Sequence, residues 1–151
     1  MEMKRNILTY AAVFFVLATL FSACKKNAPD QWLKDNINVI GKVPVIAGFT
    51  VKPPQTTNVT AGATVQLDLR YWSDDPIDKI NLRAKVGAAA QVPVSTTPYQ
   101  KAYSSISRTD SLLLSYPVPT GLAVGTAIVL EVEVLNKNAL AKKTILNLKV
   151  Q

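Results

Sequence analysis

The stretch "TAIVLEVEVLN", residues 126–136, alternates apolar and polar side chains with a period of two. Successive side chains of a β-strand point to opposite faces of a sheet, so this period predicts a strand with one buried face and one wet face. The glutamates of the stretch are expected to face water. The side chains expected to face a core are Ile128, Leu130, Val132 and Val134.

The same period recurs along the chain from Val43 onward. Turn residues such as "SDDP" (73–76) separate the alternating stretches, and none of the connections has the length of a helix. Pro93 predicts that its strand lies at a sheet edge, because proline cannot donate to a ladder. The strands expected are 43–54, 63–72, 78–87, 91–95, 110–118, 126–136 and 142–150.

About seven strands, each with one wet face, predict two antiparallel sheets packed against each other. The fold class expected is therefore all-β, and the strand count and spacing fit an immunoglobulin-like antiparallel β-sandwich over residues 43–151. The chain contains one cysteine. An intrachain disulfide is thereby excluded, and the core has to rest on aliphatic packing.

Composition limits the chemistry that the 151 residues can perform. Histidine is absent, which removes the commonest general base and the commonest zinc ligand. No pair of acids is marked out for glycoside hydrolysis, so the sequence predicts that the protein is not an enzyme and holds no cofactor. The net charge is +7, but the basic residues are scattered along strands and turns, and no nucleic-acid partner is expected.

The N-terminus has the parts of a secretory signal. Lys4 and Arg5 precede an apolar run over residues 7–21, and small residues follow directly before Cys24. The run is shorter than the roughly 20 residues that a membrane-spanning helix needs. The alternative is an uncleaved anchor that spans by thinning the bilayer.

Residues 20–24, "LFSAC", resemble the lipobox of bacterial lipoproteins, with Phe21 in place of the more usual Leu, Val or Ile. The resemblance implies removal of the signal peptide (1–23), a diacylglycerol on the sulfur of Cys24, and further acylation of the new amino group. The membrane is then a partner through this lipid. The protein is expected in the cell envelope, lipid-anchored and at the outer membrane.

Residues 24–42 are expected to form the lipidated N-terminus and a tether. The alternative is a short helix capped by Asn27 and ended by Gly41. Lys25 and Lys26 follow the cysteine, where surface-exported lipoproteins usually carry acids. The face of the membrane, periplasmic or external, therefore stays open.

Two stretches resemble bacterial immunoglobulin-like and PKD-like repeats: residues 57–87 their B-to-C hairpin region, and residues 116–150 their final hairpin. Such modules are similar to small accessory lipoproteins of starch-utilisation-type systems. The resemblance implies a membrane-anchored lipoprotein with a non-catalytic binding or accessory domain, acting in glycan capture or uptake. The alternative is a structural or adhesin-like assembly subunit that makes protein–protein contacts through exposed edge strands.

Three groups of side chains are candidates for binding. Exposed aromatic rings can stack on sugars, which makes Trp72, Tyr99 and Tyr103 candidate ligand contacts; the alternative is that Trp72 covers a loop. Loop carboxylates can hold calcium, and these are Asp74, Asp75 and Asp78; the alternative is ordinary turn chemistry with Lys79 as a partner. Residues 110–112 resemble an O-glycosylation site at Ser111.

Overall fold

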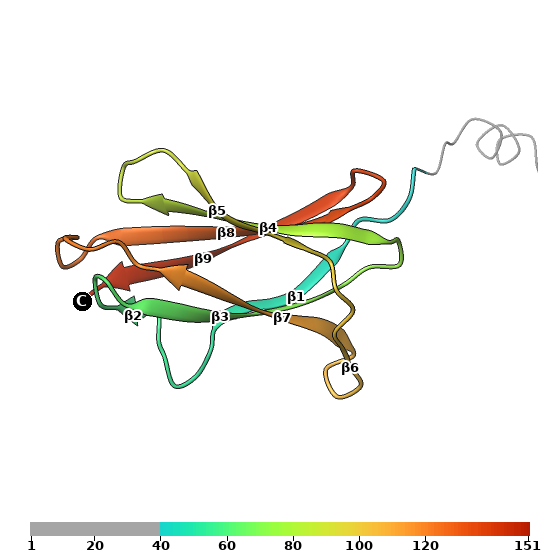
Figure 1. Cartoon of the computed structure of the whole chain (residues 1–151), viewed down its shortest axis with the longest axis horizontal. Coiled ribbons are helices and arrows are strands. Elements are labelled where there is room, and N and C mark those ends of the chain that lie inside the picture. Colours follow the sequence, from blue (N-terminus) through green and yellow to red (C-terminus); the bar gives the residue numbers. More distant parts are fainter. Residues whose placement is uncertain (1–39) are drawn as a thin grey trace, which may run out of the picture. The chain divides into compact units, whose positions relative to one another are not determined.

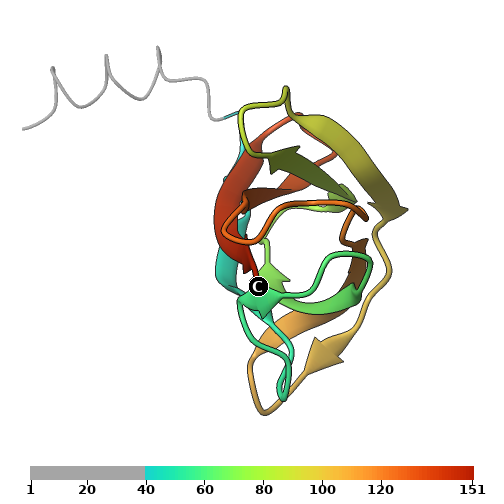
Figure 2. The ribbon, with the colours of Figure 1, turned by 90° about the vertical axis from the view of Figure 1, so that its left-hand side faces the viewer.

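The computed structural model describes residues 40–151, which form two β-sheets packed face to face (Figures 1 and 2). No helix occurs in this part of the chain. The predicted all-β sandwich is confirmed.

One sheet has four strands in the order β1-β3-β7-β6, and the other has five in the order β2-β9-β8-β4-β5. The pairings are antiparallel except for the short parallel contact between β2 and β9. The four-stranded sheet contains β1 (Val45–Val51), β3 (Thr64–Trp72), β6 (Tyr103–Ser104) and β7 (Thr109–Pro117). The five-stranded sheet contains β2 (Asn58–Val59), β4 (Ile77–Val86), β5 (Val92–Pro98), β8 (Ala127–Asn136) and β9 (Ala141–Val150).

The strand order is immunoglobulin-like. Strands β1, β3, β7 and β6 take the places of A, B, E and D, whereas β4, β8 and β9 take those of C, F and G. The predicted final hairpin is confirmed, since β8 pairs with β9 from Ala127–Lys149 to Leu135–Ala141. The predicted B-to-C hairpin is wrong. Strands β3 and β4 lie in opposite sheets, because the turn after Trp72 carries the chain across the core.

The core lies between the sheets and is built by the inward side chains of the alternating strands. Leu67, Leu82, Leu130 and Val132 have no exposed surface. Every residue that the opening stretch placed inside, from Ile128 to Val134, is fully buried. Tyr71 is the largest of the side chains that are almost completely buried. Aliphatic side chains supply most of the core, and the rings of Phe49, Tyr71 and Tyr116 complete it.

All seven expected strands are present, and Pro93 lies in β5 at the edge of its sheet. Two strands were missed. Strands β2 and β6 have two residues each, which is too short for an alternation to show.

The register defines the two ends of the sandwich. Strand β3 ends at Trp72 beside Val45, where β1 begins. We call this end, formed by segments 40–44, 73–76, 99–108 and 137–140, the proximal end, because the chain from the N-terminus enters here (Figure 1). The opposite end, formed by 52–57, 60–63, 87–91 and 118–126, is the distal end.

Candidate functional site

The predicted lipid attachment site, Cys24, and the signal peptide (1–23) lie outside the described residues. The same holds for most of the predicted tether. Within residues 40–151, no helix is long and apolar enough to cross a membrane.

The acidic loop at the proximal end binds the chain that enters the domain. Lys42 forms an ion pair with Asp74 at 2.7 Å (Nζ to Oδ2), and its backbone N–H donates to Asp75. Both the ammonium and the Asp74 carboxylate are largely exposed, so the pair itself contributes little stability. These two contacts fix residues 40–42 to the domain. The sequence had assigned these residues to the tether.

The three candidate calcium ligands do not converge. Asp75 accepts a hydrogen bond from Asn138 at 2.9 Å, and Asp78 lies 3.9 Å from the ammonium of Lys79 on β4. No group of three acidic, histidine or cysteine side chains placed to hold a metal occurs in the part of the chain that the structure describes. The carboxylates instead have basic and amide partners of the domain itself, which is the turn chemistry considered as the alternative.

Asn136, the last residue of β8, holds the proximal loops together from inside. It is 1% exposed. Its Nδ2 donates to the backbone oxygen of Lys42 at 3.0 Å and to Ser73 Oγ at 2.8 Å. One buried amide thus joins the entering chain to the β3–β4 turn. The alternation of β8 predicts an inward position for Asn136 but not these two partners.

Of the three candidate aromatic contacts, Trp72 is 41% exposed and lies on the outer face of the four-stranded sheet. It is the last residue of β3 and pairs across the strands with Val45. Because it is half on the surface, it remains accessible to a ligand.

Tyr99 has an internal role. Its hydroxyl donates to Asp110 Oδ2 at 2.8 Å, and its ring meets Tyr71 edge-on with centroids 6.4 Å apart. Burial, together with the hydrogen bond and the charge of Asp110, raises the pKa of the Tyr99 phenol. Asp110, at 7% exposure, also accepts from the backbone N–H of Ala102 at 3.0 Å. Through these bonds to Asp110, segment 99–102 is held against β7.

Tyr103 is 58% exposed on β6, the edge strand of the four-stranded sheet. Strand β7 separates it from Trp72 on β3, so the three predicted aromatic contacts do not form one platform. The candidate glycosylation residue Ser111 is half-buried near the start of β7, opposite Arg70. Its neighbour Asp110 is already bound to Tyr99.

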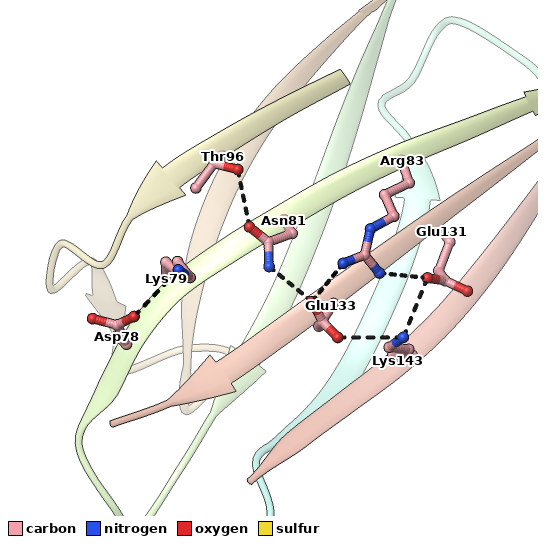
Figure 3. A network of polar contacts seen from close by, with 8 residues as sticks. All are labelled: Asp78, Lys79, Asn81, Arg83, Thr96, Glu131, Glu133 and Lys143. Carbon is pink, nitrogen blue, oxygen red and sulfur yellow. Dashed lines mark hydrogen bonds and ion pairs between the residues drawn. The ribbon is translucent and has the colours of Figure 1, made fainter. Parts of the chain in front are cut away.

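A polar network that the sequence did not reveal covers the outer face of the five-stranded sheet (Figure 3). Arg83 of β4 bonds both predicted outward glutamates, Glu131 at 3.1 Å and Glu133 at 3.2 Å (Nη to Oε). Lys143 of β9 approaches Glu133 at 3.3 Å from the other side. Asn81 adds a hydrogen bond to Glu133 at 2.8 Å. The cross-strand register places these residues directly opposite one another.

Burial raises the pKa of Glu133, but the hydrogen bonds from Asn81 and Lys143 and the charges of Arg83 and Lys143 outweigh it. The net result is a pKa below the ordinary glutamate value. The carboxylate is only 12% exposed. The carboxylate bonds Asn81, Arg83 and Lys143, so the network joins β4, β8 and β9 across the face of the sheet.

A shallow cavity of about 270 Å³ lies at the distal end, between the 54–60 segment and the start of β3. Gln55 closes one side by donating to the backbone oxygen of Thr64 and accepting from the N–H of Gln66. No aromatic ring and no acid line this cavity. None of the predicted contact residues lies in it.

Comparisons with known proteins give the fold and no family. No protein-family model matches the sequence, and no curated protein matches it. The chain is similar to a superoxide reductase (neelaredoxin) from Ignicoccus hospitalis, with a TM-score of 0.51, 12% identity, and coverage of 74% of this chain and 82% of that one.

Two further solved structures score lower. A Niemann-Pick type C2 protein from the Japanese carpenter ant has a TM-score of 0.46 at 9% identity, covering 74% of this chain and 95% of that one. The archaeal flagellum of Methanospirillum hungatei strain JF1 has a TM-score of 0.40 at 13% identity, covering 98% and 93%.

The first of these similarities corrects one prediction. The lack of histidine and of paired acids led to the prediction that the chain is not an enzyme. That prediction is wrong as an exclusion, because a sandwich of the same fold belongs to an enzyme, the superoxide reductase. A fold is a frame on which sites of many kinds are built. At 12% identity the similarity shows the frame alone and assigns no reaction to this chain.

Proposed function

We propose that the protein is a lipid-anchored component of a bacterial cell envelope that presents its immunoglobulin-like sandwich as a binding or accessory domain. The observation that carries this proposal is the position of the sole cysteine. Cys24 follows a basic start, an apolar run and two small residues, which are the parts of a secretory signal and resemble the lipobox of bacterial lipoproteins. The described domain begins at Ile40, close behind it.

The chemistry of the anchor supports stable attachment. Each buried CH₂ of an acyl chain contributes about 0.8 kcal/mol, and two or three chains hold a protein where one chain gives only marginal binding. A domain held in this way needs no spanning helix. The localisation proposed is the outer membrane.

The binding role proposed first is glycan capture or uptake. It is supported by Trp72 and Tyr103, which expose 41% and 58% of their surface. An aromatic face suits the polarised C–H groups of a sugar ring. Tyr99 is not part of this proposal, because its hydroxyl is bound to Asp110.

The second candidate is an assembly subunit that pairs through a sheet edge, and strand β1 favours it. This edge strand, "VIAGFTV", contains neither proline nor charge, whereas the edge strand β5 contains Pro93 and Pro98. Unprotected edge strands accept a strand from another chain. Strand β1 is therefore the place where such a partner would add.

The anchor is tested by Cys24→Ser in the full chain. We expect the wild-type protein in the membrane fraction and the variant either soluble or uncleaved. An unchanged membrane fraction and unchanged gel mobility of the variant would contradict the lipid anchor.

The two binding roles are separated by glycan pull-down and crosslinking in cells. Glycan retention that is lost in Trp72→Ala but kept in Leu113→Ala supports glycan capture, because Leu113 is exposed on the same sheet face. Crosslinks to an envelope protein that disappear in Thr50→Lys, a charge on the exposed side of β1, support assembly. If Trp72→Ala and Leu113→Ala behave alike, the glycan role is wrong.

A further inference from the structure

Exposed apolar side chains are concentrated at one end of the sandwich. Ten large hydrophobic residues of the described chain are exposed. Val92 and Val124 lie at the distal end, and Leu113 and Ile145 lie on the sheet faces. The six at the proximal end are Ile40, Val43, Val45, Trp72, Tyr103 and Ile106.

The register explains why these side chains gather. Val45 begins β1 opposite Trp72, the end of β3. On the other side of β3, Tyr71 pairs with Asp110 at the start of β7, so the preceding turn projects past the same end. That turn carries Ile106, which is 96% exposed. Figure 1 shows β6 and its turn at the end of the sandwich where the chain enters.

Basic residues lie at the same end as the apolar ones. The segments of the proximal end carry Lys42, Lys101, Arg108 and Lys137 against Asp74 and Asp75. Each of these aspartates has a partner within the domain. Lys101, Arg108 and Lys137 form no ion pair with any described residue. The excess charge is small, and it is positive where the apolar side chains protrude.

The chain between Cys24 and Ile40 is short. The sixteen Cα–Cα steps from Cys24 to Ile40 span at most about 55 Å when extended, and roughly 22 Å as a flexible coil. If the lipid on Cys24 lies in the bilayer, as the proposed function holds, the proximal end is kept near the headgroups. Because this chain joins the domain at the proximal end, that end reaches the membrane more easily than the distal end does.

We propose that the proximal end docks on the surface of a bilayer that contains anionic phospholipids. Trp72, Tyr103 and Ile106 enter the headgroup region, where aromatic rings with one polar edge are favoured. Lys101 and Arg108, which are two residues from Tyr103 and Ile106 in the sequence, meet the phosphates. The inference rests on the proposed lipid anchor and adds an orientation to it, with the distal cavity and the 118–126 loop directed away from the membrane.

The shape of the proximal end favours lipid over a protein partner. The exposed side chains come from several separate segments of the chain, and the cavity described above lies at the distal end, away from them. A protein interface needs a continuous, complementary patch. A lipid surface adapts to separate side chains of different height.

Trp72 is itself the reporter for the test. The full lipidated chain, in a Trp32→Phe background, is reconstituted into phosphatidylcholine–phosphatidylglycerol vesicles with and without brominated acyl chains. Docking predicts that bromine lowers the fluorescence of Trp72 about twofold, since an inserted ring contacts the acyl boundary. As a matched control, Trp32→Phe, Trp72→Phe, Val124→Trp moves the reporter to the distal end, where no quenching is expected.

Two surface variants test whether docking of the proximal end causes the quenching of Trp72. Ile106→Asp should restore most of the Trp72 fluorescence, and Val124→Asp, at a comparably exposed distal position, should not. Circular dichroism checks that both variants are folded. A chain that floats with the vesicles while Trp72 stays unquenched overturns the docking and leaves the anchor standing. A chain that does not float, and carries no lipid on Cys24, overturns both.

Discussion

The two ends of the sandwich are built by different means. At the proximal end, buried polar side chains hold the loops: Asn136 bonds Lys42 and Ser73, and Tyr99 bonds the buried Asp110. At the distal end no described polar side chain is buried, and the loops are held by the exposed Gln55 and by backbone groups such as the N–H of Gly125, which donates to Val150 at 2.8 Å.

This difference indicates which positions of the sequence tolerate substitution. A glycine turn needs a backbone that can adopt a positive φ, and neighbouring positions are open to change. A buried amide or carboxylate needs its own partners in place, and losing one of them leaves a polar group unsatisfied. The proximal end is therefore expected to tolerate fewer substitutions among its inner residues, while its exposed side chains are available for contacts.

The largest effect is expected at alkaline pH. Burial, with smaller contributions from the charges of Asp110 and Tyr99, raises the pKa of Tyr71 to about 12 from the ordinary value of 10.0. The folded state thus keeps a proton that the unfolded state loses, so stability is complete below pH 10 and falls as the pH rises toward 12. Over the whole window the loss is roughly 3 kcal/mol, at about 1.4 kcal/mol per pKa unit.

The measurement is the urea midpoint at about pH 8 and about pH 11, where the unfolded tyrosine is ionised. Tyr71→Phe should reduce the difference between the two, whereas Tyr103→Phe, at an exposed position, should leave it as it is. An equal alkaline loss in both variants would mean that Tyr71 is not the group responsible.

Asn136→Ala is expected to lower the free energy of unfolding by about 2 kcal/mol, because the backbone oxygen of Lys42 and the Ser73 hydroxyl lose the donor that the buried amide supplies. Urea denaturation measures the change. Asn138→Ala, which removes more exposed hydrogen bonds at the same end, is the control and should cost less than half as much. Equal losses would show that burial of the amide does not decide its contribution.

Tyr99→Phe separates a structural role from a ligand contact. Removing the hydroxyl takes one donor from the buried Asp110 carboxylate, which should cost about 1.5 kcal/mol. Ligand binding, where it is found, should be unchanged once the variant is folded. If Tyr99→Phe is as stable as the wild type but loses a ligand, then Tyr99 contacts the ligand and the structural role is wrong.

The smallest effect tests the distal end. Gly125 has a φ of +87°, so Gly125→Ala should cost about 1 kcal/mol in strain although the added Cβ meets no atom within 4 Å. Gly48→Ala is the matched control, since its added Cβ is equally unhindered and its φ is not positive. Thermal unfolding of the two variants should differ in that direction. Identical melting temperatures of the two variants would show that the positive φ of Gly125 does not limit which residue the distal turn accepts.

Alternation predicted strands well because it records burial, and burial decides the faces of β3, β4 and β8. It did not predict pairing. The resemblance of residues 57–87 to a B-to-C hairpin region suggested that β3 and β4 pair, but nothing in their side chains shows that the turn between them crosses to the other sheet.

The candidate site was harder to predict, because its partners are far apart in the sequence. Asp75 bonds the backbone of Lys42, 33 residues earlier, and Asn136 bonds the same residue across 94 positions. Neither carries a local signature. Tyr99 and Asp110 are closer, but an exposed aromatic and one that closes a segment over a carboxylate look alike in the sequence.

Mass spectrometry of the protein extracted from membranes tests lipid attachment most directly. The proposed anchor predicts a mature chain that begins at Cys24 and a first peptide whose mass is raised by a diacylglycerol and a further acyl chain. A peptide that contains residues from the 1–23 segment, or an unmodified Cys24, would contradict the anchor and with it the orientation of the proximal end toward the membrane.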